Sequence, residues 1–292
     1  MKSNSFIILL VAVCFSSCYP EPIPITIEET KPKIAISSTA IDANTVMVIA
    51  SYSINSLANV NYSTTGNSPL LPEGVLIEKA LVTISDGTKI YTLDKIYSGV
   101  YVNSNMNLKE GMQYNLSVTD LAEGNKVSAH TIYYEAVTAD KILPVVTRKT
   151  KDTTIQLKMR LLDNSTTLNY YVMAYDHVNP STVPSPVNSS NFSIIDMDAV
   201  KKVEIFSSAE AVNGVIDKTF SILNTKPTDT LFVHYGKIDK GYFNYLNSYK
   251  KTGSLINQIT SEPITLPTNI FTGFGFFALY NVKRDLFDLK KY

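Results

Sequence analysis

The stretch Thr154–Leu161 reads TIQLKMRL and alternates apolar with polar side chains along its whole length. Successive side chains of a β-strand point to opposite faces, so this alternation predicts a strand with one face in a core and one in water. Two further stretches, TVMVIASYSI at Thr45–Ile54 and MQYNLSVT at Met112–Thr119, contain many of the β-branched and aromatic residues that favour strands. The sequence therefore predicts a mostly β protein.

The strand-like stretches divide into two groups along the chain. In residues 33–140 they are short and regularly spaced, which favours an immunoglobulin-like or fibronectin-like sandwich. The pair Asp86-Gly87 lies between two of them and is a hairpin signal, because a type I′ turn needs positive φ at both central residues. Residues 141–292 are expected to form a second, β-rich domain, since the chain is longer than a usual single domain.

One helix is expected within the second domain, near residues 239–251. Its apolar residues are spaced at i, i+3, i+4 and i+7, which places them on one face of a helix. Asp239 can cap the first turn, and Gly253 follows the last one. The apolar face consists of Tyr242, Tyr245, Leu246 and Tyr249.

Residues 1–17 have the order of a secretory signal peptide: Lys2, then the apolar run Phe6–Phe15, then small residues. The apolar run has about ten residues, whereas a helix that spans a bilayer needs roughly twenty. Small residues stand directly before Cys18, as in the lipobox of bacterial lipoproteins, and they predict a lipid anchor on Cys18. Cys14 is the competing anchor, but the β-branched residue before it fits the lipobox poorly.

Residues 18–32 are expected to form a tether. They contain four prolines, which favour the extended polyproline II conformation, and three glutamates. Acidic residues soon after a lipidated cysteine resemble a surface-export signal, but a solvated stalk explains the same residues. Once residues 1–17 are removed, Cys18 is the one cysteine that remains in the sequence. Neither an internal disulfide nor a Cys-based metal site is therefore expected.

The net charge, the acidic pairs and the long loops of the chain each bear on what it could bind. The formal net charge is zero at pH 7, so a nucleic-acid partner, which demands a basic face, is not expected. Asp163-Asn164 and Asp196-x-Asp198 lack the acidic density of a calcium loop, and solvated turns explain both pairs. The polar loops 55–74 and 178–191 are long enough to be either functional or disordered.

Patterns that indicate catalysis or metal binding are weak. His130, His177 and His234 are far apart in the sequence and lack metal-ligand spacing. Gly273 and Gly275 match part of a dinucleotide-binding motif, but too few residues follow them for the helix and strand that this motif requires. Packing of the neighbouring phenylalanines explains these glycines better. The sequence thus predicts no catalytic, cofactor-binding or metal-binding residue.

The chain resembles the bacterial lipoproteins of the domain-of-unknown-function 4249 family over most of its length. Its closing segment, from Pro267 to Phe277, looks like the family's "P-x-N-I-x-x-G-x-G-x-F", although Phe271-Thr272 replaces more polar residues. The chain also lacks tryptophan. The other residues that carry the resemblance are Cys18 with the acidic stalk, Pro32-Lys33, Ala80–Gly87, Gly99–Tyr101, Gly111–Tyr114 and the helix Tyr242–Tyr249.

The resemblance implies a lipoprotein of the outer membrane, of a kind often encoded near TonB-dependent transporters, and it brings no established catalytic residues. We therefore expect a non-enzymatic binding or accessory component of a TonB-dependent uptake system. Its lipid would hold it on the periplasmic or the surface-exposed side of the outer membrane. A surface hydrolase that acts on glycans or peptides is one alternative, and a structural or adhesion module is another.

Overall fold

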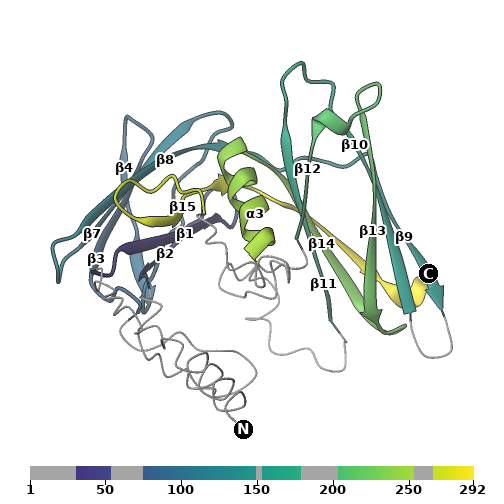
Figure 1. Cartoon of the computed structure of the whole chain (residues 1–292), viewed down its shortest axis with the longest axis horizontal. Coiled ribbons are helices and arrows are strands. Elements are labelled where there is room, and N and C mark those ends of the chain that lie inside the picture. The colour runs from purple at the N-terminus through teal and green to yellow at the C-terminus, as the bar shows by residue number, and fades with distance from the viewer. Residues whose placement is uncertain (1–30, 54–74, 149–152, 179–202, 253–265) are drawn as a thin grey trace, which may run out of the picture. The chain divides into compact units, whose positions relative to one another are not determined.

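The strands of the protein form two β-sandwiches (Figure 1). The structure is a computed structural model that describes residues 31–53, 75–148, 153–178, 203–252 and 266–292. The predicted signal peptide, Cys18 and most of the predicted tether lie outside the described residues. The loop 55–74 and all but the first residue of the loop 178–191 lie outside them as well.

Two five-stranded sheets make the first sandwich. One sheet has the order β15 (Phe274–Phe276), β1 (Ile34–Ala40), β2 (Val46–Tyr52), β6 (Val100–Asn103) and β5 (Asp94–Tyr97). The other has the order β16 (Leu279–Tyr280), β8 (Lys126–Tyr134), β7 (Gln113–Asp120), β3 (Ala80–Ser85) and β4 (Ile90–Thr92).

The core of the first sandwich forms where the two sheets face each other. Strands β7 and β8 bury every second side chain, as a strand with one face in a core must. The largest side chains in this core are fully buried tyrosines, among them Tyr101, Tyr114 and Tyr133. The predicted sandwich is confirmed, and these three tyrosines serve its packing.

The hairpin at Asp86-Gly87 joins β3 and β4 as expected, but its turn is not of type I′. Gly87 has φ +90°, whereas Asp86 does not have positive φ. The Oδ1 atom of Asp86 instead accepts hydrogen bonds from the N–H groups of Thr88 and Lys89, at 2.9 and 2.7 Å. This carboxylate therefore satisfies the backbone donors of the turn.

A three-stranded and a four-stranded sheet make the second sandwich. The first of these has the order β13 (Val215–Thr225), β10 (Thr153–Leu162) and β9 (Lys141–Arg148). The second has the order β12 (Val203–Ser207), β11 (Tyr170–Val178), β14 (Thr230–Ile238) and β17 (Lys283–Asp288), and short 3-10 turns occur at Ser208–Glu210 and Leu289–Lys291. The apolar faces of these two sheets share one buried core, so the β-rich second domain is itself a sandwich.

The alternating stretch 154–161 lies in β10, at the centre of the three-stranded sheet. Its apolar side chains face the four-stranded sheet and are at most 3% exposed, while Gln156, Lys158 and Arg160 are exposed to water. The alternation in sequence thus corresponds directly to the two faces of one strand. The buried set is Ile155, Leu157, Met159 and Leu161.

The expected helix is confirmed as α3 (Lys240–Thr252). The Oδ1 atom of Asp239 accepts a hydrogen bond from the N–H of Tyr242 at 2.9 Å, so Asp239 caps the helix. Tyr242 and Leu246 are buried, and the helix packs on β11 and β12, beside which Figure 1 draws it. The aromatic face predicted from the spacing is therefore the packed face.

The segment 266–282, which we call the clasp, comes from the second half of the sequence but completes the first sandwich. Its strand β15 pairs in parallel with β1, where Gly275 lies opposite Ile36. Its strand β16 pairs in parallel with β8, where Leu279 lies opposite Tyr133. The chain then returns to the second sandwich as β17. A boundary at residue 140 separates the two groups of consecutive strands, but the first sandwich also contains strands from the clasp.

Residues Pro32–Tyr292 form one compact unit. A third apolar cluster joins the outer face of the four-stranded sheet, helix α3 and the clasp, and it includes Ile238, Leu246 and Phe276. Among the helices of the described residues, none combines the length and apolar character needed to span a bilayer.

Candidate functional site

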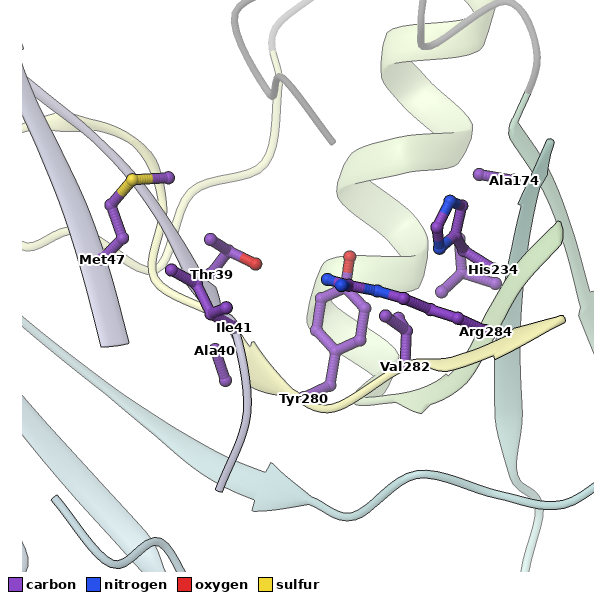
Figure 2. A pocket seen from close by; sticks show the side chains of 10 residues that line it. Thr39, Ala40, Ile41, Met47, Ala174, His234, Tyr280, Val282 and Arg284 are labelled. Carbon is purple, nitrogen blue, oxygen red and sulfur yellow. The ribbon is translucent and has the colours of Figure 1, made fainter. Parts of the chain in front are cut away.

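A cavity of about 120 Å³ lies between the first sandwich and the outer face of the four-stranded sheet (Figure 2). One wall comes from the end of β1 and the start of β2, and it presents Thr39, Ile41 and Met47. The opposite wall comes from β11, β14 and β17 together with the end of the clasp. That wall presents Val172, Ala174, His234, Tyr280, Val282 and Arg284.

Strand alternation explains why His234 faces the cavity. Leu231, Val233 and Tyr235 of β14 turn into the core of the second sandwich, so His234 must turn outward. In the register of the sheet, His234 lies opposite Ala174 on β11 and opposite Arg284 on β17. Directly opposite residues of one face are near neighbours, so the imidazole and the guanidinium share one surface.

The imidazole of His234 is shifted towards its neutral form. Burial lowers its pKa below the ordinary value of 6.5, and the positive charge of Arg284 lowers it further. The negative charge of Asp176 acts in the opposite direction on this pKa. At neutral pH His234 therefore offers one hydrogen-bond donor and one acceptor without a charge.

Tyr280 contributes a neutral hydroxyl to the same wall. Its side chain is 6% exposed, and its ring centre lies 5.6 Å from that of Tyr242 on helix α3. Burial raises the pKa of Tyr280 to about 12, although a hydrogen bond with Tyr242 lowers it in part. In Figure 2 the long side chain of Arg284 extends over Val282 towards Tyr280.

Arg284 is thus the charged side chain among residues that are otherwise neutral or apolar around this cavity. A guanidinium binds carboxylates through two parallel hydrogen bonds, while methionine and isoleucine offer an apolar surface. Such a combination suits a ligand that has an anionic group and an apolar part.

The structure does not bring the three histidines together. His130 lies on β8, His177 on β11 and His234 on β14, and the described residues contain no group of metal-ligating side chains. His177 has a structural partner: its Nδ1 atom lies 3.2 Å from Oδ2 of Asp229, which is 3% exposed. This pair joins the end of β11 to the turn before β14.

The interpretation of Asp163 as part of a solvated turn was wrong. Asp163 is 8% exposed, and its carboxylate accepts hydrogen bonds from the hydroxyl of Tyr171 at 2.7 Å and from the amide of Asn169 at 3.0 Å. Burial alone would raise its pKa, but these bonds and the N–H of Ser165 outweigh burial, and the pKa lies below its ordinary value. The other pair, Asp196-x-Asp198, lies outside the described residues.

Sequence reasoning missed the cavity because its lining comes from four separate parts of the chain. Positions 39–47, 172–174, 234 and 280–284 share no motif, and each is an outward position of a strand or its end. Arg284 itself lies among other charged residues in β17, which reads KRDLFD, so its charge does not single it out in the sequence. Cys18, the loop 55–74 and all but the first residue of the loop 178–191 lie outside the described residues.

Comparison with known proteins identifies the family but no activity. Among solved structures, the selenomethionine-substituted chicken interferon gamma receptor alpha chain matches with 9% identity, covering 72% of this chain and 90% of that chain. The TM-score of 0.20 is too low to support an argument. A search of curated proteins gives no match. The family described as "Domain of unknown function (DUF4249)" matches residues 20–285, and the chain belongs to this family.

Proposed function

We propose that this chain is a lipid-anchored protein of the outer membrane that binds a ligand or a partner without transforming it. It would act as an accessory component of a TonB-dependent uptake system, on the periplasmic or the surface-exposed side. The N-terminal sequence supports the anchor, because small residues precede Cys18 after an apolar run of signal-peptide length.

The observation that carries the binding role is the cavity between the two sandwiches. Ligand sites are typically concave and mostly apolar, with a few placed polar groups, and this cavity combines Met47 and Val172 with His234 and Arg284. On one wall of the cavity, β14 is paired with β17, and on the other wall, β1 is paired with strand β15 of the clasp. The site is therefore preformed, which lowers the entropy lost on binding.

Affinity isolation tests the accessory role. A tagged full chain is recovered from gently solubilised membranes, and co-isolated proteins and small molecules are identified by mass spectrometry. We expect a TonB-dependent transporter, or a bound small molecule, to accompany the protein. Recovery of the protein alone, from membranes in which the transporter is present, would contradict the proposal.

The anchor has its own test, with a matched control inside the signal peptide. Cys18→Ala should abolish metabolic labelling by a fatty-acid analogue and release or misprocess the protein. Cys14→Ala should leave labelling unchanged, because that cysteine is removed with residues 1–17. Loss of labelling in Cys14→Ala with retention in Cys18→Ala would show that the competing cysteine is the anchor.

A further inference from the structure

Arg284 differs from the other two arginines of the sequence in its hydrogen-bond and ion-pair partners. The guanidinium of Arg148 donates to two backbone carbonyl oxygens at the C-terminal end of the chain, at 2.7 and 2.8 Å. Arg160 pairs with the carboxylate of Asp217, with Nε and Oδ1 at 2.9 Å. Within the part of the chain that the structure describes, Arg284 has no ion pair and no side-chain hydrogen bond.

The surroundings of Arg284 favour a negatively charged partner. Its opposite neighbour on β14 is His234, which is largely neutral, and the side chains of Val282 and Ala174 provide apolar surface on the same wall. The side chain of Arg284 is itself exposed, and the charge-assisted hydrogen bonds that its guanidinium can donate to an anion are stronger than hydrogen bonds between neutral groups.

The volume of the cavity limits the size of its occupant. The cavity has a volume of about 120 Å³, well above the roughly 10–15 Å³ that a single buried water needs. The occupant is therefore a small molecule, or the end of a larger one, with an apolar part of a few carbon atoms. Met47 can adjust its conformation to apolar groups of different shape.

The charges around the cavity favour one negative charge over two. Arg284 supplies one positive charge, and Asp176 lies near enough to His234 to affect its protonation. A dianion such as phosphate would carry one negative charge more than the single guanidinium can balance. A carboxylate monoanion balances the guanidinium and matches its planar, two-pronged geometry.

We infer that this cavity binds a small carboxylate that carries an apolar group, with the carboxylate on Arg284 and the apolar group against Met47 and Val172. Neutral His234 and Tyr280 supply further hydrogen-bonding groups. The inference rests on the proposed binding function and adds the chemical class of the ligand. A free short-chain acid and the C-terminal carboxylate of an apolar peptide share this chemistry.

Calorimetric titration of the full lipidated chain in detergent tests the inference with four probes. Hexanoate and hexanamide form one pair with and without charge. A tripeptide that ends in leucine, with a free or an amidated C-terminus, forms the other. We expect at least one carboxylate to bind and its amide partner to bind at least tenfold more weakly. Tighter binding of hexanoate would identify a free acid as the ligand, and tighter binding of the tripeptide with a free C-terminus would identify a peptide end.

Arg284→Gln and Lys283→Gln form a matched pair of variants on the same strand. Arg284→Gln should weaken carboxylate binding at least tenfold, since a charged hydrogen bond contributes enough for that factor. Lys283→Gln removes the same charge from the neighbouring position, which points to the other face of β17, and should leave binding within twofold. Circular dichroism and thermal unfolding check that both variants fold.

Equal affinity for acid and amide, or unchanged affinity in Arg284→Gln, would overturn the inference. If a transporter still accompanies the protein in affinity isolation, that result leaves the proposed accessory function standing. If hexanoate or the peptide binds through Arg284 but no transporter accompanies the protein, the ligand class stands and the transporter partnership fails. The two proposals therefore fail in distinguishable ways.

Discussion

The side chain of Asn269 is joined to the backbone of Phe277 by two hydrogen bonds. Its Nδ2 atom donates to the carbonyl oxygen of Phe277 at 2.7 Å, and its Oδ1 atom accepts from the N–H of Phe277 at 2.8 Å. The same amide also donates to the carbonyl oxygen of His130 on β8, at 3.1 Å. The side chain of Asn269 thus makes the two backbone hydrogen bonds that a neighbouring strand would otherwise make with Phe277. The ring of Phe277 is fully buried in the first sandwich.

Asn269→Asp should destabilise the protein by about 1–3 kcal/mol. The substitution keeps the acceptor for the N–H of Phe277 but removes the donor, so two carbonyl oxygens lose their partner. Denaturant unfolding measures the change in the free energy of unfolding. Asn244→Asp, at an exposed position of helix α3, serves as the control and should change stability by less than about half of that amount.

Gly275→Ala should be much more harmful than Gly87→Ala, although both glycines have φ near +90°. In both, an alanine strains the backbone by about 1–2 kcal/mol. At Gly275 the added Cβ would also lie 2.0 Å from the carbonyl oxygen of Ile36, whereas nothing lies within 4 Å of a Cβ at Gly87. The pairing of β15 with β1 must then open. Comparing both variants by urea unfolding tests this, and equal losses would contradict it.

A fragment of residues 32–140 should fail to fold by itself, because it lacks the two clasp strands. Without them, the edges of β1 and β8 are unpaired and the space filled by Phe277 is empty. Fusing residues 266–282 to the fragment through a flexible linker should restore a folded sandwich. Dispersed amide signals in a nuclear magnetic resonance spectrum would report the fold. A well-dispersed spectrum for the unfused fragment would show that the clasp is dispensable.

The sequence was sufficient for those parts of the fold in which a local pattern determines the structure. The alternation in 154–161 gave the central strand β10, and the aromatic spacing after Asp239 gave the packed face of α3. The sequence of the clasp was less informative about its place in the fold. Its strands β15 and β16 are short, and their partners lie more than 140 residues away, so no local pattern could identify their sheets.

The candidate site could not be predicted for a related reason. A cavity between two sandwiches depends on how distant strands meet, and its lining residues appear in the sequence as ordinary outward positions. His234 lacks metal-ligand spacing to the other histidines, and nothing near it in the sequence indicates that Arg284 lies opposite. The family's closing motif is different: Asn269, Gly273 and Gly275 are explained by the contacts that hold the clasp.

Tyr171→Phe should destabilise the second sandwich by about 1–3 kcal/mol at neutral pH, because buried Asp163 loses a hydrogen-bond donor. The pKa of Asp163 lies below its unfolded value, so its bonds contribute stability above the unfolded pKa. That contribution is lost as the pH falls through the folded pKa. The difference between the two proteins should therefore shrink in strong acid. A constant difference across the pH range of unfolding experiments would contradict this account.

The pKa of His234 gives the last prediction, and its sign is opposite to that of Asp163. Burial and Arg284 lower the folded pKa below 6.5, so the unfolded state binds the proton more readily. Stability conferred by the neutral form is present above pH 6.5 and declines as the pH falls below that value. Among the described residues, the charged groups that act on His234 are Arg284 on β17 and Asp176 on β11, whereas Thr39 and Met47 line the same cavity from the first sandwich without charge.

His234→Gln should therefore lose less stability than the unaltered protein between pH 6.5 and 5, because glutamine does not take up a proton. Arg284→Gln should reduce the pH dependence of stability only in part, since burial is the larger cause of the lowered pKa of His234 and Arg284 the smaller.

The affinity for a carboxylate should depend on pH in the opposite direction. Protonated His234 adds a second positive charge to the wall, so the affinity should rise as the pH falls, and this rise should be absent in His234→Gln. If the unaltered protein and His234→Gln showed the same dependence on pH, both in stability and in carboxylate affinity, the imidazole would lie outside the site.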